Sequence, residues 1–184
     1  KRNVSVDIRF IKTLKRLYNK LNKCEIKWIL QSTPMGFGHA LLSAKKFVGN
    51  DSFLLHTGDA YFPNYQFMIP LIKKFQKKSE LSGILLLQPK KNLEGYGIAQ
   101  TTKQIGEIVV TNVQEKPKKP LSNLAILPLY FFRPDVFQAL KNTSDGYNCE
   151  LQVTDAVKTL LNWDRKILGE IYKEKYWFDI GTPQ

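Results

Sequence analysis

Short, continuous apolar runs separated by helix-length segments constrain the fold of this chain most strongly. The clearest run lies at residues 82–87 (SGILLL), and another, at residues 52–56 (SFLLH), is followed by Thr57-Gly58-Asp59. Between them, residues 65–78 carry apolar side chains at helical spacing. A strand that is buried on both faces has a continuous apolar sequence, and this occurs where helices cover both faces of a sheet. The pattern therefore predicts an α/β fold.

The rest of the chain extends this pattern without a linker or an internal repeat. Further helices are expected over residues 8–21, 39–47, 134–141 and 151–162, and further strands over residues 25–30, 97–101, 107–114, 124–132, 166–172 and 175–180. We expect one continuous domain over residues 1–184, Rossmann-like, with a mixed, mainly parallel sheet flanked by helices. Its ligand cleft is expected at the carboxyl ends of the early strands.

Composition excludes several classes of protein. Hydrophobic residues make up 43% of the 184 residues, which is too many for a disordered tail. The longest apolar run is far too short to span a membrane, and the chain does not open with a signal sequence, so we expect a soluble, cytoplasmic protein without a membrane partner. The two cysteines are widely separated and indicate neither a disulfide framework nor a zinc site.

The net charge of +12 is unevenly distributed, because residues 1–50 hold nine of the surplus positive charges. One reading is a basic surface for nucleic acid. The other is the solvated side of an amphipathic helix, since the basic residues of the segment 8–21 alternate with helically spaced apolar ones. Tyr18 of this helix belongs to the apolar set, whereas a surface that binds single strands presents aromatics beside its charges. We therefore expect no nucleic-acid partner.

Two aspartates stand where predicted strands end, and each has a glycine beside it. Asp59 follows the strand at residues 52–56, and Asp179 lies in Trp-Phe-Asp-Ile-Gly near the end of the chain. Mg²⁺ is usually held by one or two carboxylates together with phosphate oxygens and water, so two such side chains could share one ion. The alternative is that each aspartate caps a turn.

Two other segments carry residue types suited to a phosphorylated ligand. Glu115-Lys116-Pro117 follows a strand, and the glutamate could accept from sugar hydroxyls while the lysine pairs with a phosphate. Adjacent side chains on an extended strand face opposite ways, so both can contact one ligand only if the strand has ended or twisted there. The alternative is a solvated charge cluster. Residues 31–40 (QSTPMGFGHA) join a strand to a helix and could approach a flat or anionic ligand, or form an ordinary turn.

Taken in order, these and further motifs resemble those of the sugar-1-phosphate nucleotidylyltransferases. The matching segments are Gln31-x-x-Pro-x-Gly36-x-Gly-His-Ala, Gly58-Asp59, Gly95-Tyr-Gly97, Glu115-Lys116-Pro117, Ser122-Asn-Leu-Ala, Glu150-Leu-Gln-Val-Thr-Asp-Ala and Trp177-x-Asp179-x-Gly-Thr. The branches that this chain resembles most are the glucose-1-phosphate uridylyl- and thymidylyltransferases. The resemblance implies the nucleotide-diphospho-sugar transferase type of fold.

The resemblance also assigns roles in nucleotide and metal binding. Gln31 and Gly36 match positions that read the nucleotide base, and Asp59 and Asp179 match the two magnesium-binding aspartates. The implied cofactor is Mg²⁺, and the implied partners are a nucleoside triphosphate, with UTP or dTTP favoured, and a sugar 1-phosphate, with glucose 1-phosphate favoured. A homo-oligomer is compatible with the resemblance.

The sugar phosphate is assigned to a second set of positions. Gly97, Glu115 and Lys116 match contacts to the sugar phosphate, with the glutamate on hydroxyls and the lysine on the phosphate, while Tyr130 and Glu150 match further positions of the sugar pocket. In the family reaction an oxygen of the sugar 1-phosphate attacks the α-phosphorus of the triphosphate and pyrophosphate leaves. Catalysis needs no protein nucleophile, because positioning and charge stabilisation by the metal site and Lys116 suffice.

The sequence departs from the family in one large respect. The family opens with a glycine-rich loop, G-x-G-T-R, which does not occur here. We therefore expect an N-terminally incomplete domain that lacks its first βαβ unit and is preceded by further residues in the natural protein. A catalytically inactive relative that binds nucleotide sugars is the alternative. A smaller departure is Leu127-Pro128, where the family usually has a glycine before Leu-Tyr.

Overall fold

The computed structural model describes residues 7–143, 150–174 and 176–181. Contacts divide the chain into two compact units, residues 1–30 and 31–184, where the sequence led us to expect one continuous domain. Within the described ranges, no helix is both long and apolar enough to cross a membrane.

The first unit consists of one helix and an extended segment. Helix α1 (Ile8–Leu21) confirms the predicted amphipathic helix, and the Asp7 carboxylate caps its first turn by accepting from the backbone N–H of Arg9 at 2.8 Å. The strand predicted over residues 25–30 is wrong, because these residues form no ladder. An alternating apolar pattern forms a strand only beside a neighbour that takes its backbone hydrogen bonds.

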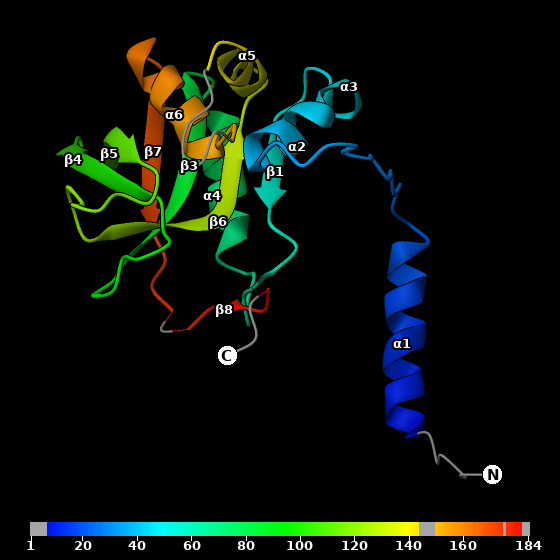
Figure 1. Ribbon diagram of the computed structural model, residues 1–184. Coiled ribbons are helices and arrows are strands. Elements are labelled where there is room, and N and C mark those ends of the chain that lie inside the picture. Colours follow the sequence, from blue (N-terminus) through cyan, green and yellow to red (C-terminus); the bar gives the residue numbers. More distant parts are fainter. Residues whose placement is uncertain (1–6, 144–149, 175, 182–184) are drawn as a thin grey trace. The chain divides into compact units, whose positions relative to one another are not determined.

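The second unit is built around a mixed sheet (Figure 1). Its strands are β1 (Phe53–His56), β3 (Leu81–Pro89), β4 (Ile98–Gln104), β5 (Glu107–Gln114), β6 (Leu124–Phe132) and β7 (Lys166–Ile171). Their spatial order is β1-β6-β3-β7-β5-β4, and β4 also pairs with β6 where Ile98 meets Ala125. The strands predicted in these regions are confirmed within a few residues.

The directions of the strands confirm a mixed sheet, in which parallel pairing is less common than we expected. β1, β3, β4 and β7 run one way, while β5 and β6 run the other. Most hydrogen-bonded pairs are nevertheless antiparallel, because β6 lies between β1 and β3, and the described pair that runs parallel is β3–β7. β4 and β5 form a hairpin whose two turn residues, Ile105 and Gly106, both have positive φ, which suits the twist of adjacent strands.

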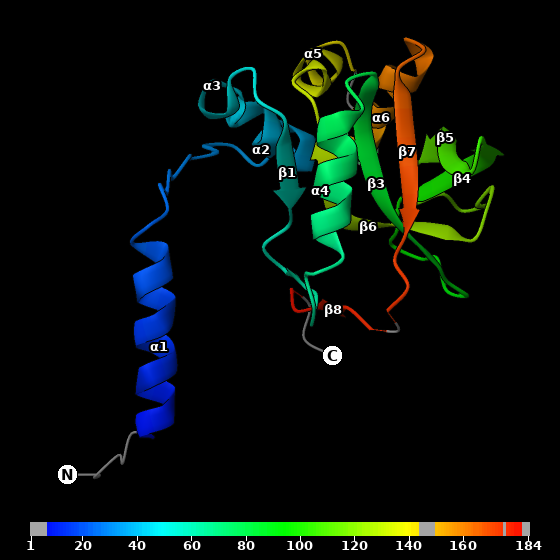
Figure 2. The same cartoon turned by 180° about the vertical axis from the view of Figure 1, so that it is seen from behind.

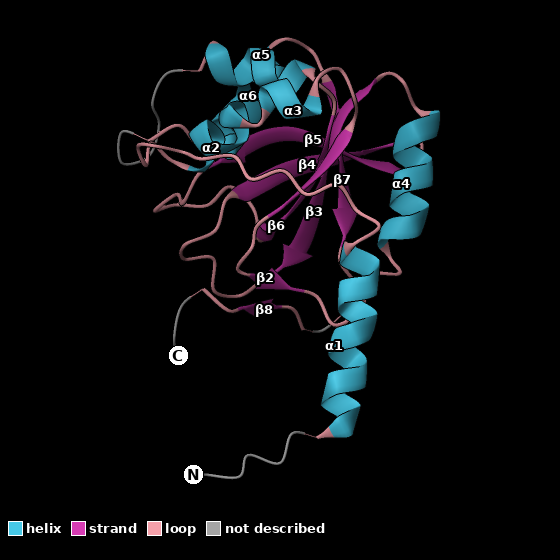
Figure 3. Cartoon of the chain, turned by 90° about the vertical axis from the view of Figure 1, so that its right-hand side faces the viewer, coloured by secondary structure: helices cyan, strands magenta, loops and turns pink. Residues whose placement is uncertain are grey.

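Helices cover both faces of this sheet, as the apolar strands predicted. Helices α2 (Phe37–Ser43), α3 (Lys45–Val48), α5 (Asp135–Lys141) and α6 (Val153–Asn162) lie on one side, and α4 (Met68–Lys77) lies on the other (Figures 2 and 3). On β3, Leu85 and Leu87 belong to the core beneath α5 and α6, whereas Ile84 and Leu86 belong to the core beneath α4. The alternation explains why residues 84–87 of this strand are apolar at four successive positions.

A small second sheet joins two distant parts of the sequence. β2 (Ala60–Tyr61) pairs antiparallel with β8 (Phe178–Asp179), so that Ala60 faces Asp179. β2 was not predicted, and β8 occupies only part of the strand predicted over residues 175–180, of which residue 175 lies outside the described ranges. A strand of two residues carries no periodic pattern that a sequence analysis can detect. This pairing brings the two predicted metal-binding segments together.

Candidate active site

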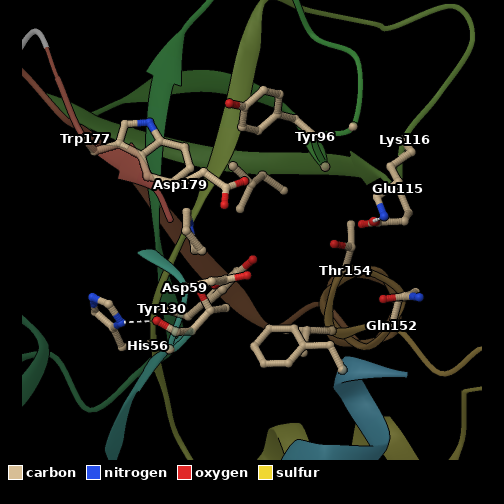
Figure 4. Close-up of a pocket in the computed structure, with 18 residues that line it drawn as sticks. His56, Asp59, Tyr96, Glu115, Lys116, Tyr130, Gln152, Thr154, Trp177 and Asp179 are labelled. Atoms are coloured by element: carbon tan, nitrogen blue, oxygen red, sulfur yellow. Dashed lines mark hydrogen bonds and ion pairs between the residues drawn. The ribbon is translucent and has the colours of Figure 1, made fainter. Parts of the chain in front are cut away.

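A pocket of about 700 Å³ opens beside the C-terminal end of β1 and gathers residues from both sheets and from α6. The candidate site residues that line it are Asp59, Gly97, Glu115, Lys116, Tyr130 and Asp179. In Figure 4, Asp59 and Asp179 lie on one side of the pocket, and Glu115 and Lys116 lie on the other. Residues separated by more than a hundred positions in the sequence thus share one cavity.

Asp59 and Asp179 face the same small space beside Gly181. A Cβ atom built on Gly181 would lie 3.1 Å from Asp59 Oδ2 and 3.4 Å from Asp179 Oδ1, so a glycine there leaves room for both carboxylates. The backbone N–H of Ile180 donates to the Asp59 carbonyl at 2.7 Å and fixes the two segments together.

The chemistry of this pair fits a magnesium site in which the substrate supplies some of the metal ligands. Among the described residues, no three His, Cys, Asp or Glu side chains form a ready-made metal cage. Both aspartates are exposed to solvent. Mg²⁺ is commonly held by one or two accessible carboxylates, with phosphate oxygens and water as its remaining ligands.

Glu115 and Lys116 both line the pocket because the strand ends before them. β5 stops at Gln114, and Lys116 has φ +39°, an uncommon conformation for a residue with a side chain. The turn is held by the Lys116 N–H, which donates to the Tyr96 carbonyl at 3.2 Å. Lys116 Nζ lies 3.8 Å from Glu115 Oε1, so the end of the strand, rather than a twist within it, lets neighbouring side chains meet.

Glu115 is largely withdrawn from solvent, with a side chain that is 13% exposed. Burial raises the pKa of its carboxyl, and the hydrogen bond from Thr154 and the charge of Lys116 offset part of this effect. Gly97 lies against the same carboxylate, since a Cβ atom built there would be 3.3 Å from Glu115 Oε2 and 3.2 Å from Thr154 Oγ1. The glycine keeps this part of the pocket open.

Tyr130 forms an apolar wall of the pocket. Its ring stacks on Phe132 with the centroids 5.7 Å apart, and its side chain is buried. Burial, followed by the negative charge of Glu115, raises the pKa of the Tyr130 phenol well above its ordinary value. Burial thus favours the neutral form of the phenol.

The other three predicted site residues lie together outside the pocket lining. Gln31 Nε2 donates to the Gly36 carbonyl at 3.2 Å, and Gly36 has φ +95° and packs so closely that a Cβ atom would lie 2.8 Å from the Cβ of Glu150. Glu150 accepts from Gln152 Nε2 at 3.0 Å, and Gln152 does line the pocket. The structure thus joins Gln31, Gly36 and Glu150 to one another and connects them to the pocket through Gln152.

Sequence reasoning missed several residues of the pocket wall. These are Phe37, His56, Thr57, Tyr96, Ile126, Pro128, Gln152, Val153, Thr154 and Trp177. For some of them a signal was present, because Tyr96 stands between two glycines and Trp177 is two residues from Asp179. For His56 the sequence held no signal. In the structure its Nε2 pairs with the Tyr65 hydroxyl at 3.2 Å and its Nδ1 with the Thr57 carbonyl at 2.5 Å.

Comparison with known proteins identifies the family. The model of the nucleotidyl transferase family matches residues 9–184, nearly the whole chain. The chain belongs to the nucleotidyl transferase family. Among curated relatives of this nucleotidyl transferase chain, the low-salt glycan biosynthesis nucleotidyltransferase Agl11 of Haloferax volcanii is 35% identical over 160 residues, which are 87% of this chain and 43% of that protein.

Other members of the family match over similar lengths. A glucose-1-phosphate thymidylyltransferase of Streptomyces antibioticus is 30% identical over 158 residues, covering 86% of this chain and 43% of the relative. The crystal structure of a UDP-glucose pyrophosphorylase complexed with UDP-glucose superposes with a TM-score of 0.82 at 26% identity, over 97% of this chain and 69% of the other. The chain spans less than half the length of the two curated relatives. The mixed α/β architecture is that of nucleotidyltransferases.

Proposed function

We propose that the protein transfers a nucleotidyl group from a nucleoside triphosphate to a sugar 1-phosphate. The observation that carries the proposal is the single pocket in which paired carboxylates, Asp59 and Asp179, face Glu115 and Lys116 (Figure 4). Curated relatives are named as glucose-1-phosphate thymidylyltransferase and as UTP–glucose-1-phosphate uridylyltransferase, which supports glucose 1-phosphate with dTTP or UTP as the favoured substrates.

In the proposed reaction a phosphate oxygen of the sugar 1-phosphate forms a bond to the α-phosphorus of the triphosphate. The bond from that phosphorus to the oxygen bridging to the β-phosphate breaks, and pyrophosphate leaves. Asp59 and Asp179 would hold Mg²⁺, which supplies positive charge to the phosphates when it is bound. Lys116, at the opposite side of the pocket, stabilises the negative charge of the sugar phosphate as a point charge.

The remaining residues orient the two substrates in this proposal. Glu115 accepts hydrogen bonds from sugar hydroxyls beside Gly97, and Tyr130 forms a wall of the sugar pocket. Glu150 acts from the adjoining cluster through Gln152. Gln31 and Gly36 receive the base, for which the side-chain amide offers both a donor and an acceptor.

Product analysis with the natural protein tests this function. Each common nucleoside triphosphate is mixed with each of several hexose 1-phosphates and Mg²⁺, and released pyrophosphate and nucleotide sugar are measured together. We expect equimolar products, with glucose 1-phosphate and a pyrimidine triphosphate as the best pair. Binding of a nucleotide sugar without pyrophosphate release from any pair would instead indicate an inactive relative. A homo-oligomer and a cytoplasmic location remain predictions.

A further inference from the structure

The segment that carries Asp179 places one side chain, Trp177, away from full solvent exposure. Within residues 176–181, every residue is exposed except Trp177, and Phe178 and Ile180 are 49% and 67% exposed. β8 contributes only two residues to its ladder with β2. The Ile180 N–H donates to the Asp59 carbonyl at 2.7 Å, and Asp179 Oδ1 accepts from the Gly181 N–H at 2.9 Å. Beyond these hydrogen bonds, the position of the Asp179 carboxylate depends on how firmly Trp177 is packed.

Trp177 packs between groups from two other segments of the site. Its indole stacks on Phe62 with ring centroids 5.9 Å apart and an interplanar angle of 22°, and Phe62 is fully buried only three residues after Asp59. The rings of Tyr96 and Trp177 form a T-shaped pair, with centroids 6.3 Å apart and an interplanar angle of 75°. The indole thus ties the Asp179 segment both to the turn of Asp59 and to the loop that precedes Gly97.

The ammonium group of Lys90 lies over two rings of this cluster, those of Tyr96 and Trp177. Lys90 Nζ is 4.7 Å from the centroid of Tyr96 and 5.3 Å from that of Trp177, within the range of cation–π attraction. The Lys90 backbone N–H donates to the Asn123 carbonyl at 2.9 Å, which anchors the residue beside the start of β6. No carboxylate of the described residues forms an ion pair with Lys90.

We propose that Lys90 is a positioning residue that holds Trp177 against Tyr96 and thereby keeps Asp179 beside Asp59 for metal binding. This rests on the proposed function, because it assumes that the two aspartates bind the ion. Lys90 acts through the rings and does not line the pocket. The positive charge carries the effect, since a neutral unbranched side chain of similar length can fill most of the space but is not attracted by the ring quadrupoles.

Metal binding without turnover measures this role directly. Mn²⁺, used in place of Mg²⁺, is titrated into the natural protein while electron paramagnetic resonance follows free Mn²⁺. We expect Lys90→Met to raise the Kd for Mn²⁺ roughly five- to thirtyfold, the equivalent of two cation–π contacts. Lys90→Arg keeps the cation and should stay within about twofold of the natural protein, as should the matched control Lys91→Met, which alters the exposed neighbouring lysine.

Two results would overturn the proposal: an unchanged Kd in Lys90→Met, or an equal loss in Lys90→Arg, which would show that charge is irrelevant. Lys90→Gln provides a second neutral variant, with the same expected loss, if circular dichroism shows that Lys90→Met does not fold. Asp179→Asn separates this proposal from the proposed function. If Asp179→Asn retains Mn²⁺ affinity, the metal assignment and the role of Lys90 both fail; if only Asp179→Asn loses affinity, the role of Lys90 alone fails.

Discussion

Gly97 shows how the absence of one side chain shapes the proposed sugar pocket. A methyl group there would press on Glu115 Oε2 and Thr154 Oγ1 at 3.3 and 3.2 Å, closer than ordinary van der Waals contact. We expect Gly97→Ala to raise the KM for the sugar 1-phosphate about tenfold by crowding the pocket. The unfolding temperature should change little, because Glu115 and Thr154 can shift towards the cavity. Steady-state kinetics and thermal unfolding check the two expectations, and an unchanged KM would contradict the assigned place of the sugar.

Glu115 should give sugar binding a distinctive pH dependence. Burial raises its pKa above the ordinary 4.5, so the carboxylate becomes protonated at a higher pH than an exposed glutamate does. Only the ionised form accepts through both oxygens, and we therefore expect kcat/KM for the sugar phosphate to fall, by about tenfold per pH unit, as pH drops through the raised pKa. Glu115→Gln should be less active and should lack this acidic limb. A limb that persists in Glu115→Gln would assign it to another group.

At the scale of residues, the sequence predicted contacts between side chains that are close together in the chain. Pro117 already suggested that the strand ends near Glu115 and Lys116, and the end of β5 at Gln114 confirms that strand end and places both side chains in the pocket lining. Trp177 and its partner Lys90 could not be predicted as a contact, because nothing in the spacing of two residues so far apart indicates that their side chains meet.

At the scale of elements, the side chain of Arg133 links several segments that the strand pairings do not connect. Its Nε donates to the Leu81 carbonyl at 2.7 Å, one terminal nitrogen donates to Ser52 Oγ, and the other donates to the carbonyls of Phe75 and Lys78, each at 3.0 Å. The guanidinium thus links the end of β6 to the start of β3 and the C-terminal end of α4. A lysine keeps the charge but cannot reproduce this fork.

We therefore expect Arg133→Lys to lower the free energy of unfolding by about 2–4 kcal/mol, the cost of several lost charge-assisted hydrogen bonds. Urea denaturation measures it. Arg165→Lys is the matched control, because Arg165 is 57% exposed and its ion pair with Asp135 spans 4.0 Å, so its change should stay below about 1 kcal/mol. Equal effects in the two variants would show that Arg133 is not a structural link.

The errors in predicting elements have a common cause, which is that a strand depends on its neighbours. Residues 25–30 have the period of a strand but no ladder partner, whereas β2 has a partner but is too short to show a period. Helix α1 was predictable because its hydrogen bonds are internal. The antiparallel course of β6 follows from pairings with β1 and β3, which local sequence does not encode.

For the whole molecule, the order of the motifs indicated the family better than the distribution of charge did. The surplus of +12 suggested a polyanion partner, yet much of it lies on the polar side of α1 and beside it, outside the pocket. The order of motifs was more informative, because distant segments such as those of Asp59 and Asp179 converge on one cavity. Composition bounded the class of protein, whereas motif order indicated the family that the comparison identified.

The central claim is that Asp59 and Asp179 jointly support nucleotidyl transfer in this pocket. The most direct test is pyrophosphate release by the natural protein carrying Asp59→Asn or Asp179→Asn, with Asp51→Asn, an exposed aspartate outside the pocket, as the control. We predict that each site variant loses at least about a thousandfold in kcat while retaining its circular dichroism, and that the control keeps full activity. Undiminished turnover in either site variant would contradict the account.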